Sequence, residues 1–243
     1  MGAEYGAVTK ALLAAPHDRA SERALAEQVC NASLHGLDVD GAAISLLSSS
    51  VSRLTLWATD PTAELLEDLQ FTLNEGACME AAKSGSPVLV PDLDDTTATR
   101  RWPVFAAAVS ERTGAKALFA LPLQWGAITL GVLDLYRNTP GGLSETQGRD
   151  AMLAVETAAL ILLAMRTAPR RGTEPDVPRL LDYSVFSRAE IHQATGMVLA
   201  QLGIGAQEAL ARLRGYSFRE GRLLIDVARD VVARRVRFTE EMR

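Results

Sequence analysis

Few side chains in this sequence have both the type and the spacing to do chemistry. The two cysteines, Cys30 and Cys78, stand far apart, without the spacing of a zinc site or a disulfide framework. Cys78 follows a glycine–alanine pair at an expected helix start, where the helix dipole could lower the thiol pKa and suit a redox switch. The commoner role of such a cysteine is a small buried side chain.

Two other groups of residues are candidates for binding. Trp102 follows Arg100 and Arg101 and could line a pocket mouth or cap an anion, although packing is the commoner role of tryptophan. The acidic run PDLDD at residues 91–95 lacks the glycine-bearing loop of a calcium site, so we interpret it as a turn. No phosphate-binding loop, HExxH motif, GxSxG elbow or kinase signature occurs. The sequence therefore predicts a protein that is not an enzyme and holds no metal.

Composition narrows the class of protein further. Of 243 residues, 48% are hydrophobic and 23% are charged, which is ordinary globular usage. The longest nearly uncharged apolar run, residues 152–165, is shorter than the roughly 20 residues of a membrane-spanning helix. The first residues show no basic leader followed by an apolar block, so no signal peptide is predicted. We expect a cytoplasmic protein without a membrane partner.

Charge is distributed unequally along the chain. The formal net charge is −5, yet residues 166–243 contain 14 arginines and ten acidic groups, a balance of +4. Residues 1–165 consequently carry a balance of −9. This asymmetry suggests two domains with different partners. The arginine-rich end could face a polyanion, or its arginines could form an ordinary solvated helical surface.

The elements that position these residues form two groups, separated by APRRGTEPDVP at residues 168–178. Proline lacks a backbone donor and disfavours helix in the residue before it, so this stretch reads as a linker. The predicted divisions are an N-terminal segment, a first domain, the linker and a second domain, at residues 1–19, 20–166, 167–179 and 180–243.

The first domain mixes helical and strand patterns. Apolar spacing predicts helices over residues 21–35, 63–69, 76–84, 102–110 and 144–165, the last with Ser144 and Gln147 as a capping box. Strands are predicted over residues 42–47, 53–58, 87–90, 117–125 and 128–136, with turns at residues 48–50 and at Gly126. The pattern indicates an α+β domain in which an antiparallel sheet is flanked by helices.

The second domain is purely helical, with three helices predicted over residues 187–202, 206–216 and 222–235. Ser187 and Glu190 form a capping-box pair at the start of the first. So small a unit can bury little apolar surface, and we expect contact with a partner or a second copy to stabilise it. The helix over residues 144–165 is apolar on more than one face, which predicts a homodimer.

The helical end resembles the ANTAR domain in three ordered motifs, which are IHQATGMVL at 191–199, EALARLRGYS at 208–217 and LIDVARDVV at 224–232. The preceding domain is similar to actinobacterial GAF domains in five segments, NEGACMEA at 74–81, PDL at 91–93, RWPVF at 101–105, LPL at 121–123 and GVLDLY at 131–136. The order of the two resemblances is that of GAF–ANTAR regulators. These join a sensor domain to a three-helix module that binds RNA hairpins and acts in transcription antitermination.

The ANTAR resemblance implies an RNA-binding face, because dimeric members hold two adjacent hairpins that each present a loop base. Carried onto this sequence, the face comprises Ala194, Thr195, Gly196, Arg214, Tyr216, Ser217, Arg219 and Arg222. Small residues would admit a loop closely, arginines would pair with phosphates or stack, and the tyrosine would stack on a base. The alternatives are tight helix packing for the small residues, a core-edge role for the tyrosine and plain surface charge for the arginines.

The sequence departs from its relatives at two cationic positions. Many relatives have lysine at the position of Thr195, and Arg-Lys at the positions of Arg222 and Leu223. Fewer cations facing phosphates imply weaker binding and a shallower salt dependence, by about 0.7 in slope for each missing cation on single strands. These departures motivate an alternative function, a signalling adaptor whose helical end dimerises or binds a protein.

The GAF resemblance implies a pocket between sheet and helices for a small-molecule effector, with Cys78 and Trp102 as candidate lining residues. The cyclic-nucleotide signature of phosphodiesterase GAF domains is absent. The histidines, His17, His35 and His192, lie outside the expected pocket, so haem ligation by histidine is not expected. The cofactor or effector stays unidentified, and a pocket filled by side chains is the alternative.

Overall fold

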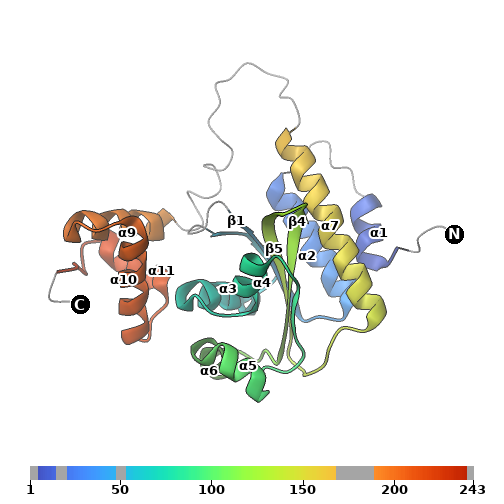
Figure 1. Ribbon diagram of the computed structural model, residues 1–243, viewed down its shortest axis with the longest axis horizontal. Coiled ribbons are helices and arrows are strands. Elements are labelled where there is room, and N and C mark those ends of the chain that lie inside the picture. The colour runs from blue at the N-terminus through green and yellow to red at the C-terminus, as the bar shows by residue number, and fades with distance from the viewer. Residues whose placement is uncertain (1–4, 15–20, 48–52, 168–188, 240–243) are drawn as a thin grey trace. The chain divides into compact units, whose positions relative to one another are not determined.

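The computed structural model describes residues 5–14, 21–47, 53–167 and 189–239. The chain divides into two compact units, one built on a β-sheet and the other on the helices α9 to α11 (Figure 1). The predicted turn at 48–50, the predicted linker at 168–178 and Ser187 of the second predicted capping box lie outside the described residues. Within the described ranges, no helix combines the length and the apolar character needed to cross a lipid bilayer.

The first unit is built on an antiparallel sheet with the strand order β2-β1-β5-β4-β3. Its strands are β1 (Gly41–Leu47), β2 (Arg53–Ala58), β3 (Val88–Val90), β4 (Ala117–Trp125) and β5 (Ile128–Arg137). Gly126 has a positive φ of 58° in the tight β4–β5 turn, a conformation that glycine adopts without strain. The predicted α+β fold with an antiparallel sheet is confirmed.

Helices cover both faces of this sheet (Figure 1). On one side lie α1 (Ala7–Ala14), α2 (Glu22–Leu37) and α7 (Glu145–Thr167), and on the other α3 (Pro61–Leu73) and α4 (Ala77–Ser84). Two short helices, α5 (Thr96–Arg101) and α6 (Pro103–Arg112), precede β4 where the sequence predicted one helix over residues 102–110. Pro103 begins α6 because the first position of a helix needs no backbone donor.

The two faces of the sheet have opposite chemical character, because side chains alternate along each strand. The face toward α2 and α7 carries large apolar residues that form the main core, among them Ile44, Phe119 and Leu135. The alternate positions include small and polar residues, among them Ala43, Ser45, Arg53, Thr55, Ala120 and Asp134, beside the apolar Leu118 and Val132. A polar face beneath α3 and α4 is therefore available for chemistry while the opposite face stabilises the fold.

Helix α1 falls within the predicted N-terminal segment and was not predicted as a helix. Val8 and Leu12 are fully buried against α2 and α7. The Asp150 carboxylate accepts hydrogen bonds from the backbone N–H groups of Val8 and Thr9, at 2.9 and 3.2 Å, and from the Thr9 hydroxyl at 2.7 Å. The buried Asp150 carboxylate on α7 thus accepts hydrogen bonds from the first backbone N–H groups of α1, which lies 142 positions earlier in the chain.

The predicted capping box of α7 is confirmed. The Gln147 N–H donates to Ser144 Oγ at 3.2 Å, and the Ser144 N–H donates to Gln147 Oε1 at 2.8 Å. These reciprocal bonds start the helix at the predicted residue.

The second unit consists of α9 (Ala189–Leu202), α10 (Ala206–Arg219) and α11 (Leu224–Val232). Each helix contributes a stripe of buried residues, with Ala194 and Val198 from α9, Leu213 from α10, and Val227 and Val231 from α11. Helix α11 is shorter at both ends than the predicted 222–235. The predicted all-helical fold of this end is confirmed.

Candidate functional site

Cys78 lies in the first turn of α4, below the polar face of the sheet. Its backbone N–H donates to Gln70 Oε1 at 2.7 Å, a buried bond between α4 and α3. Gly76 precedes the helix with φ of +116°, and a Cβ there would lie 2.6 Å from the same Gln70 oxygen. The close approach of Gly76 to Gln70 therefore fixes where Cys78 sits.

A buried ion pair lies beside Cys78. Arg53 on β2 and Glu67 on α3 are joined by a 2.5 Å contact from Arg53 Nη2 to Glu67 Oε2, with side chains only 4% and 1% exposed. The hydroxyls of Ser45 and Thr55 donate to the same oxygen, the latter at 3.3 Å. The other oxygen, Glu67 Oε1, is buried and receives no hydrogen bond from any N–H or hydroxyl group of the described residues. Three donors thus anchor one half of the carboxylate and leave the other half facing inward.

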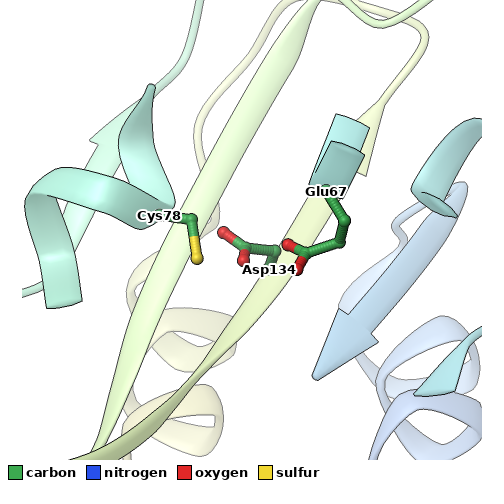
Figure 2. A group of neighbouring side chains, drawn as sticks. All are labelled: Glu67, Cys78 and Asp134. Atoms are coloured by element: carbon green, nitrogen blue, oxygen red, sulfur yellow. The ribbon is translucent and has the colours of Figure 1, made fainter. Parts of the chain in front are cut away.

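Asp134 on β5 completes the group. Figure 2 shows its carboxylate between the Cys78 thiol and the Glu67 carboxylate, with all three side chains pointing toward one another. One potential ligand atom from each lies within 4.8 Å of the other two. Asp134 Oδ2 is also buried and receives no hydrogen bond from an N–H or hydroxyl group in the described part of the chain, so Asp134 pairs through its own proton with Glu67 and with the Cys78 thiol. Alanines, Ala43 and Ala120, oppose Asp134 on both neighbouring strands, so no large side chain crowds it.

Burial controls the protonation of this cluster. Desolvation raises the pKa of Cys78, so the thiol keeps its proton near neutral pH, and desolvation together with the Glu67 carboxylate raises the pKa of Asp134 well above its usual range. Burial would also raise the pKa of Glu67, but the Arg53 guanidinium and the hydrogen bonds to Glu67 outweigh it and hold this pKa below its usual range. Cys78 is the small buried side chain that was its commoner role in the sequence, and the less common role, a thiol with a lowered pKa, fails because desolvation outweighs the helix dipole at a fully buried sulfur.

Trp102 has the packing role that the sequence left as its alternative. The side chain is buried between α5 and α6 and meets Phe105 edge-on, with ring centroids 6.4 Å apart. The Arg101 guanidinium covers the Trp102 ring at 4.6 Å and is itself paired with Glu80 on α4. This arrangement explains Trp102 by packing and cation–π contact, without a ligand.

A separate groove lies on the opposite side of the sheet, between α2, α7 and β1. Its cavity volume is only about 10 Å³, and its lining is almost wholly apolar, including Leu25, Val29, Leu56 and Leu162. Pockets for drug-sized ligands usually enclose about 300–1,000 Å³. This groove is smaller and brings together none of the candidate pocket residues.

The second unit separates the predicted RNA-binding residues into buried and accessible groups. Ala194 and Ser217 are fully buried on the inward stripes of α9 and α10, because Ala194 shares its stripe with Val198 and Ser217 shares its stripe with Leu213. Burial favours the tight helix packing that the sequence left as the alternative for the small residues. Their place in an RNA-binding face stays a prediction.

Thr195 and Gly196 lie beside this inward stripe. The Thr195 hydroxyl donates to the Ile191 carbonyl at 2.7 Å, within the helix. Gly196 is exposed, and a Cβ added there would meet nothing within 4 Å. Tight helix packing therefore does not explain this glycine, whereas its backbone is accessible to a ligand.

The arginines and the tyrosine have partners of their own. Arg219 covers the Tyr216 ring at 4.9 Å, and the same ring packs against Phe238 with centroids 5.4 Å apart. Arg222 Nη2 contacts Asp230 Oδ2 at 2.7 Å. Hydrogen bonds from Arg222 and from Arg235 lower the pKa of Asp230. Arg214, the remaining predicted arginine, lies on α10.

Phe218 was missed by the sequence reasoning. Its side chain is 60% exposed on α10, on the same outward stripe as Ala211 and the exposed Gly215. The signal was its place in the helical period, one residue beyond the inward Leu210–Leu213–Ser217 stripe. An exposed aromatic ring between Arg219 and two small residues can stack on an unpaired base.

Comparison with known proteins identifies both units. The GAF domain family matches residues 19–163, more than half of the chain, and the ANTAR domain matches residues 181–232. No match was found among curated proteins. Among solved structures, a domain of a protein described as a two-component sensor histidine kinase from Sinorhizobium meliloti is 16% identical with a TM-score of 0.50, covering 61% of this chain and 94% of its own.

Two further structures are similar to the first unit. The GAF domain of a phosphoenolpyruvate-protein phosphotransferase from Coxiella burnetii is 17% identical, with a TM-score of 0.48 and coverage of 65% of this chain and 90% of its own. A free methionine-R-sulfoxide reductase from Neisseria meningitidis, solved with its substrate, is 15% identical with a TM-score of 0.48, covering 65% and 86%. At these identities the likeness concerns the fold alone.

Proposed function

Because the chain belongs to the GAF domain family and carries an ANTAR domain after it, we propose that it is a sensor-coupled regulator that binds paired RNA hairpins and promotes transcription antitermination in the cytoplasm. The observation that carries the proposal is the order of the two domains. The exposed surface of α9 and α10 supplies a second support, since Gly196, Phe218 and Arg219 are all accessible there.

Each accessible residue has a role that its surroundings allow. Gly196 lets an RNA loop approach the helix backbone, because no side chain occupies that space. Phe218 offers an open aromatic face to an unstacked base, which is the usual target of sequence-specific RNA recognition. Arg219 and Arg222 supply positive charge to nearby phosphates, the latter by exchanging its contact with Asp230.

A homodimer would let one molecule hold two hairpins at once. Leu153, Thr157, Leu160 and Ala164 follow the i, i+4, i+7, i+11 spacing along α7, and both leucines are exposed. This spacing is that of a helix–helix seam. An effector that favoured one arrangement of α2 and α7 would change the separation of two ANTAR domains, and so the effective concentration at the second hairpin.

The experiment is a titration of the full chain into RNA selected from a library of paired hairpins with randomised loops. Single hairpins and loop-scrambled pairs serve as controls, at two salt concentrations. We expect tighter binding to the selected pair, weakening as salt rises. Equal and weak binding to all three RNAs would overturn the proposal.

A protein-binding adaptor is the second candidate function. Arg222 is already paired with Asp230, and Arg219 is stacked on Tyr216 and contacts Glu220 at 3.2 Å, which reduces the positive charge offered to phosphates. Reversing the charge of Arg219 distinguishes the two functions. An RNA-binding face loses its hairpins in this variant, whereas a pure dimerisation module keeps its partner.

A further inference from the structure

Three side chains from three separate elements converge under the polar face of the sheet, where the sequence predicted no metal. The geometry points to a binding site for one divalent transition-metal ion, held by Glu67 of α3, Cys78 of α4 and Asp134 of β5 (Figure 2). Two buried oxygens, Glu67 Oε1 and Asp134 Oδ2, receive no hydrogen bond from any described group outside the cluster; without a metal, only the cluster's own protons, shared by Asp134 with Glu67 and Cys78, hold them together. This inference goes beyond the proposed function and does not depend on RNA binding.

The spacing of the three groups fits a shared ion. Zinc lies about 2.3 Å from a cysteine sulfur and about 2.0–2.2 Å from a carboxylate oxygen, so two ligands of one tetrahedral ion are about 3.4–3.7 Å apart. The potential ligand atoms of Glu67, Cys78 and Asp134 all lie within 4.8 Å of one another. Side-chain rotations that bring these atoms up to about 1 Å closer together place them on one ion.

The charges of the cluster also balance around a divalent cation. Arg53 and Glu67 neutralise each other across their 2.5 Å contact. An ionised Asp134 and a Cys78 thiolate would add two negative charges to a buried space, which one divalent cation cancels. When the ion binds, the carboxyl proton of Asp134 and the thiol proton of Cys78 pass to solvent.

The surrounding residues hold two of the ligands in place. Ser45, Arg53 and Thr55 anchor Oε2 of Glu67 and so fix the direction of Oε1. Gln70 accepts the Cys78 N–H and fixes the turn that carries the sulfur. Hydrogen bonds that orient ligands in this way are characteristic of protein metal sites, and removing one typically weakens metal affinity 10- to 100-fold.

The donor set selects the class of metal. Two carboxylates with a thiolate suit Fe²⁺, Co²⁺ or Zn²⁺, whereas Mg²⁺ and Ca²⁺ prefer sets made only of oxygen. Three protein ligands leave a coordination position for a small exogenous molecule. The first unit would then detect its signal as a ligand of the bound metal.

The test uses Co²⁺ as the probe on the full chain, purified with chelator under anaerobic, reducing conditions. We expect one Co²⁺ per chain, with the near-ultraviolet charge-transfer absorption of a cobalt–thiolate bond. Cys78→Ser should abolish that absorption. Cys30→Ser is the matched control, because Cys30 is equally buried but lies in the apolar core on the other side of the sheet.

Asp134→Asn provides a second variant that keeps the shape of the side chain, and circular dichroism verifies that each variant is folded. Its Co²⁺ affinity should fall at least 10-fold. The inference is overturned if the folded wild-type chain shows no thiolate absorption with Co²⁺, if Cys30→Ser rather than Cys78→Ser removes it, or if Asp134→Asn binds Co²⁺ as tightly as the wild type.

Discussion

At the scale of single residues, Gly196 stands inside helix α9 although no packing contact requires it to lack a side chain. Glycine in a helix interior costs about 1 kcal/mol relative to alanine. A cost of this size without a packing reason points to a function that needs the bare backbone. Phe218 is the complementary case, because a 60% exposed phenylalanine also contributes little to stability where it stands.

Gly196→Ala should raise the free energy of unfolding by up to about 1 kcal/mol, because the added methyl group meets nothing within 4 Å. The same change should weaken hairpin binding, and Gly196→Gln should weaken it further. Denaturant titration and RNA titration measure the two effects. Gly148→Ala in α7 is the control, since its Cβ also meets nothing, and it should leave RNA affinity unchanged. Unchanged RNA affinity in both Gly196 variants would contradict this role.

Phe218→Ala should weaken binding to the paired hairpins by about 1–3 kcal/mol, the contribution of one stacked base. Its melting temperature should hardly change, because the ring is mostly in solvent. Phe218→Trp should retain affinity, since indole also stacks. If Phe218→Ala binds the paired hairpins as tightly as the wild type does, Phe218 is not part of the RNA interface.

At the scale of elements, α1 shows how a distant residue can complete a helix. Its eight residues are too few for a stable isolated helix. Burial of Val8 and Leu12, together with the carboxylate of Asp150, supplies what the local sequence lacks. The helix is therefore stable only as long as α7 is in place.

Asp150→Ala should release α1 while the sheet stays folded. The substitution leaves two buried N–H groups without acceptors, at about 1–3 kcal/mol for each unsatisfied group. Hydrogen exchange over residues 7–14 should become fast, while exchange in β4 and β5 stays slow. Thr9→Val, which removes only the hydroxyl donor, should have a smaller effect. Protection of α1 equal to that of the wild type in Asp150→Ala would contradict this anchoring.

The sequence predicted those elements whose ends are marked by residues at the ends themselves. Gly126 marks the β4–β5 turn, and Ser144 with Gln147 marks the start of α7. Helix α1 escaped prediction because its stabilising partner lies 142 positions away. The buried cluster escaped for the same reason, since Glu67, Cys78 and Asp134 come from three separate elements and only Cys78 stood out. In retrospect, an aspartate within the apolar run of β5 was the available signal.

At the scale of the whole molecule, the proposed mechanism depends on two chains acting together. Exposed leucines on α7 provide a seam for dimerisation. A dimer binds paired hairpins more tightly than a monomer does, because the first hairpin bound raises the effective concentration of the second. Dimerisation and affinity for a pair of hairpins should therefore be lost together, while affinity for a single hairpin is kept.

Leu160→Glu should convert the dimer to a monomer, because it places a charge in the apolar seam. Light scattering measures the mass, and RNA titration should show lower affinity for the pair with an unchanged affinity for one hairpin. Arg149→Gln, at an exposed position on the same helix, lowers the net charge by the same single unit and is the control. A Leu160→Glu variant that stays dimeric would place the dimer interface elsewhere.

The strand order has a consequence for synthesis on the ribosome. The central strands β1 and β5 pair Gly41 with Tyr136 and Leu46 with Gly131, so about 90 residues separate partners in the middle of the sheet. At roughly 5–20 residues per second, β1 waits on the order of 5–20 s for its partner to be translated. Helix α1 waits longer still, until Asp150 emerges. The first half of the nascent chain therefore cannot complete its sheet until more than half of the chain has been translated. We expect chaperones that bind emerging apolar strands to bind it during this time.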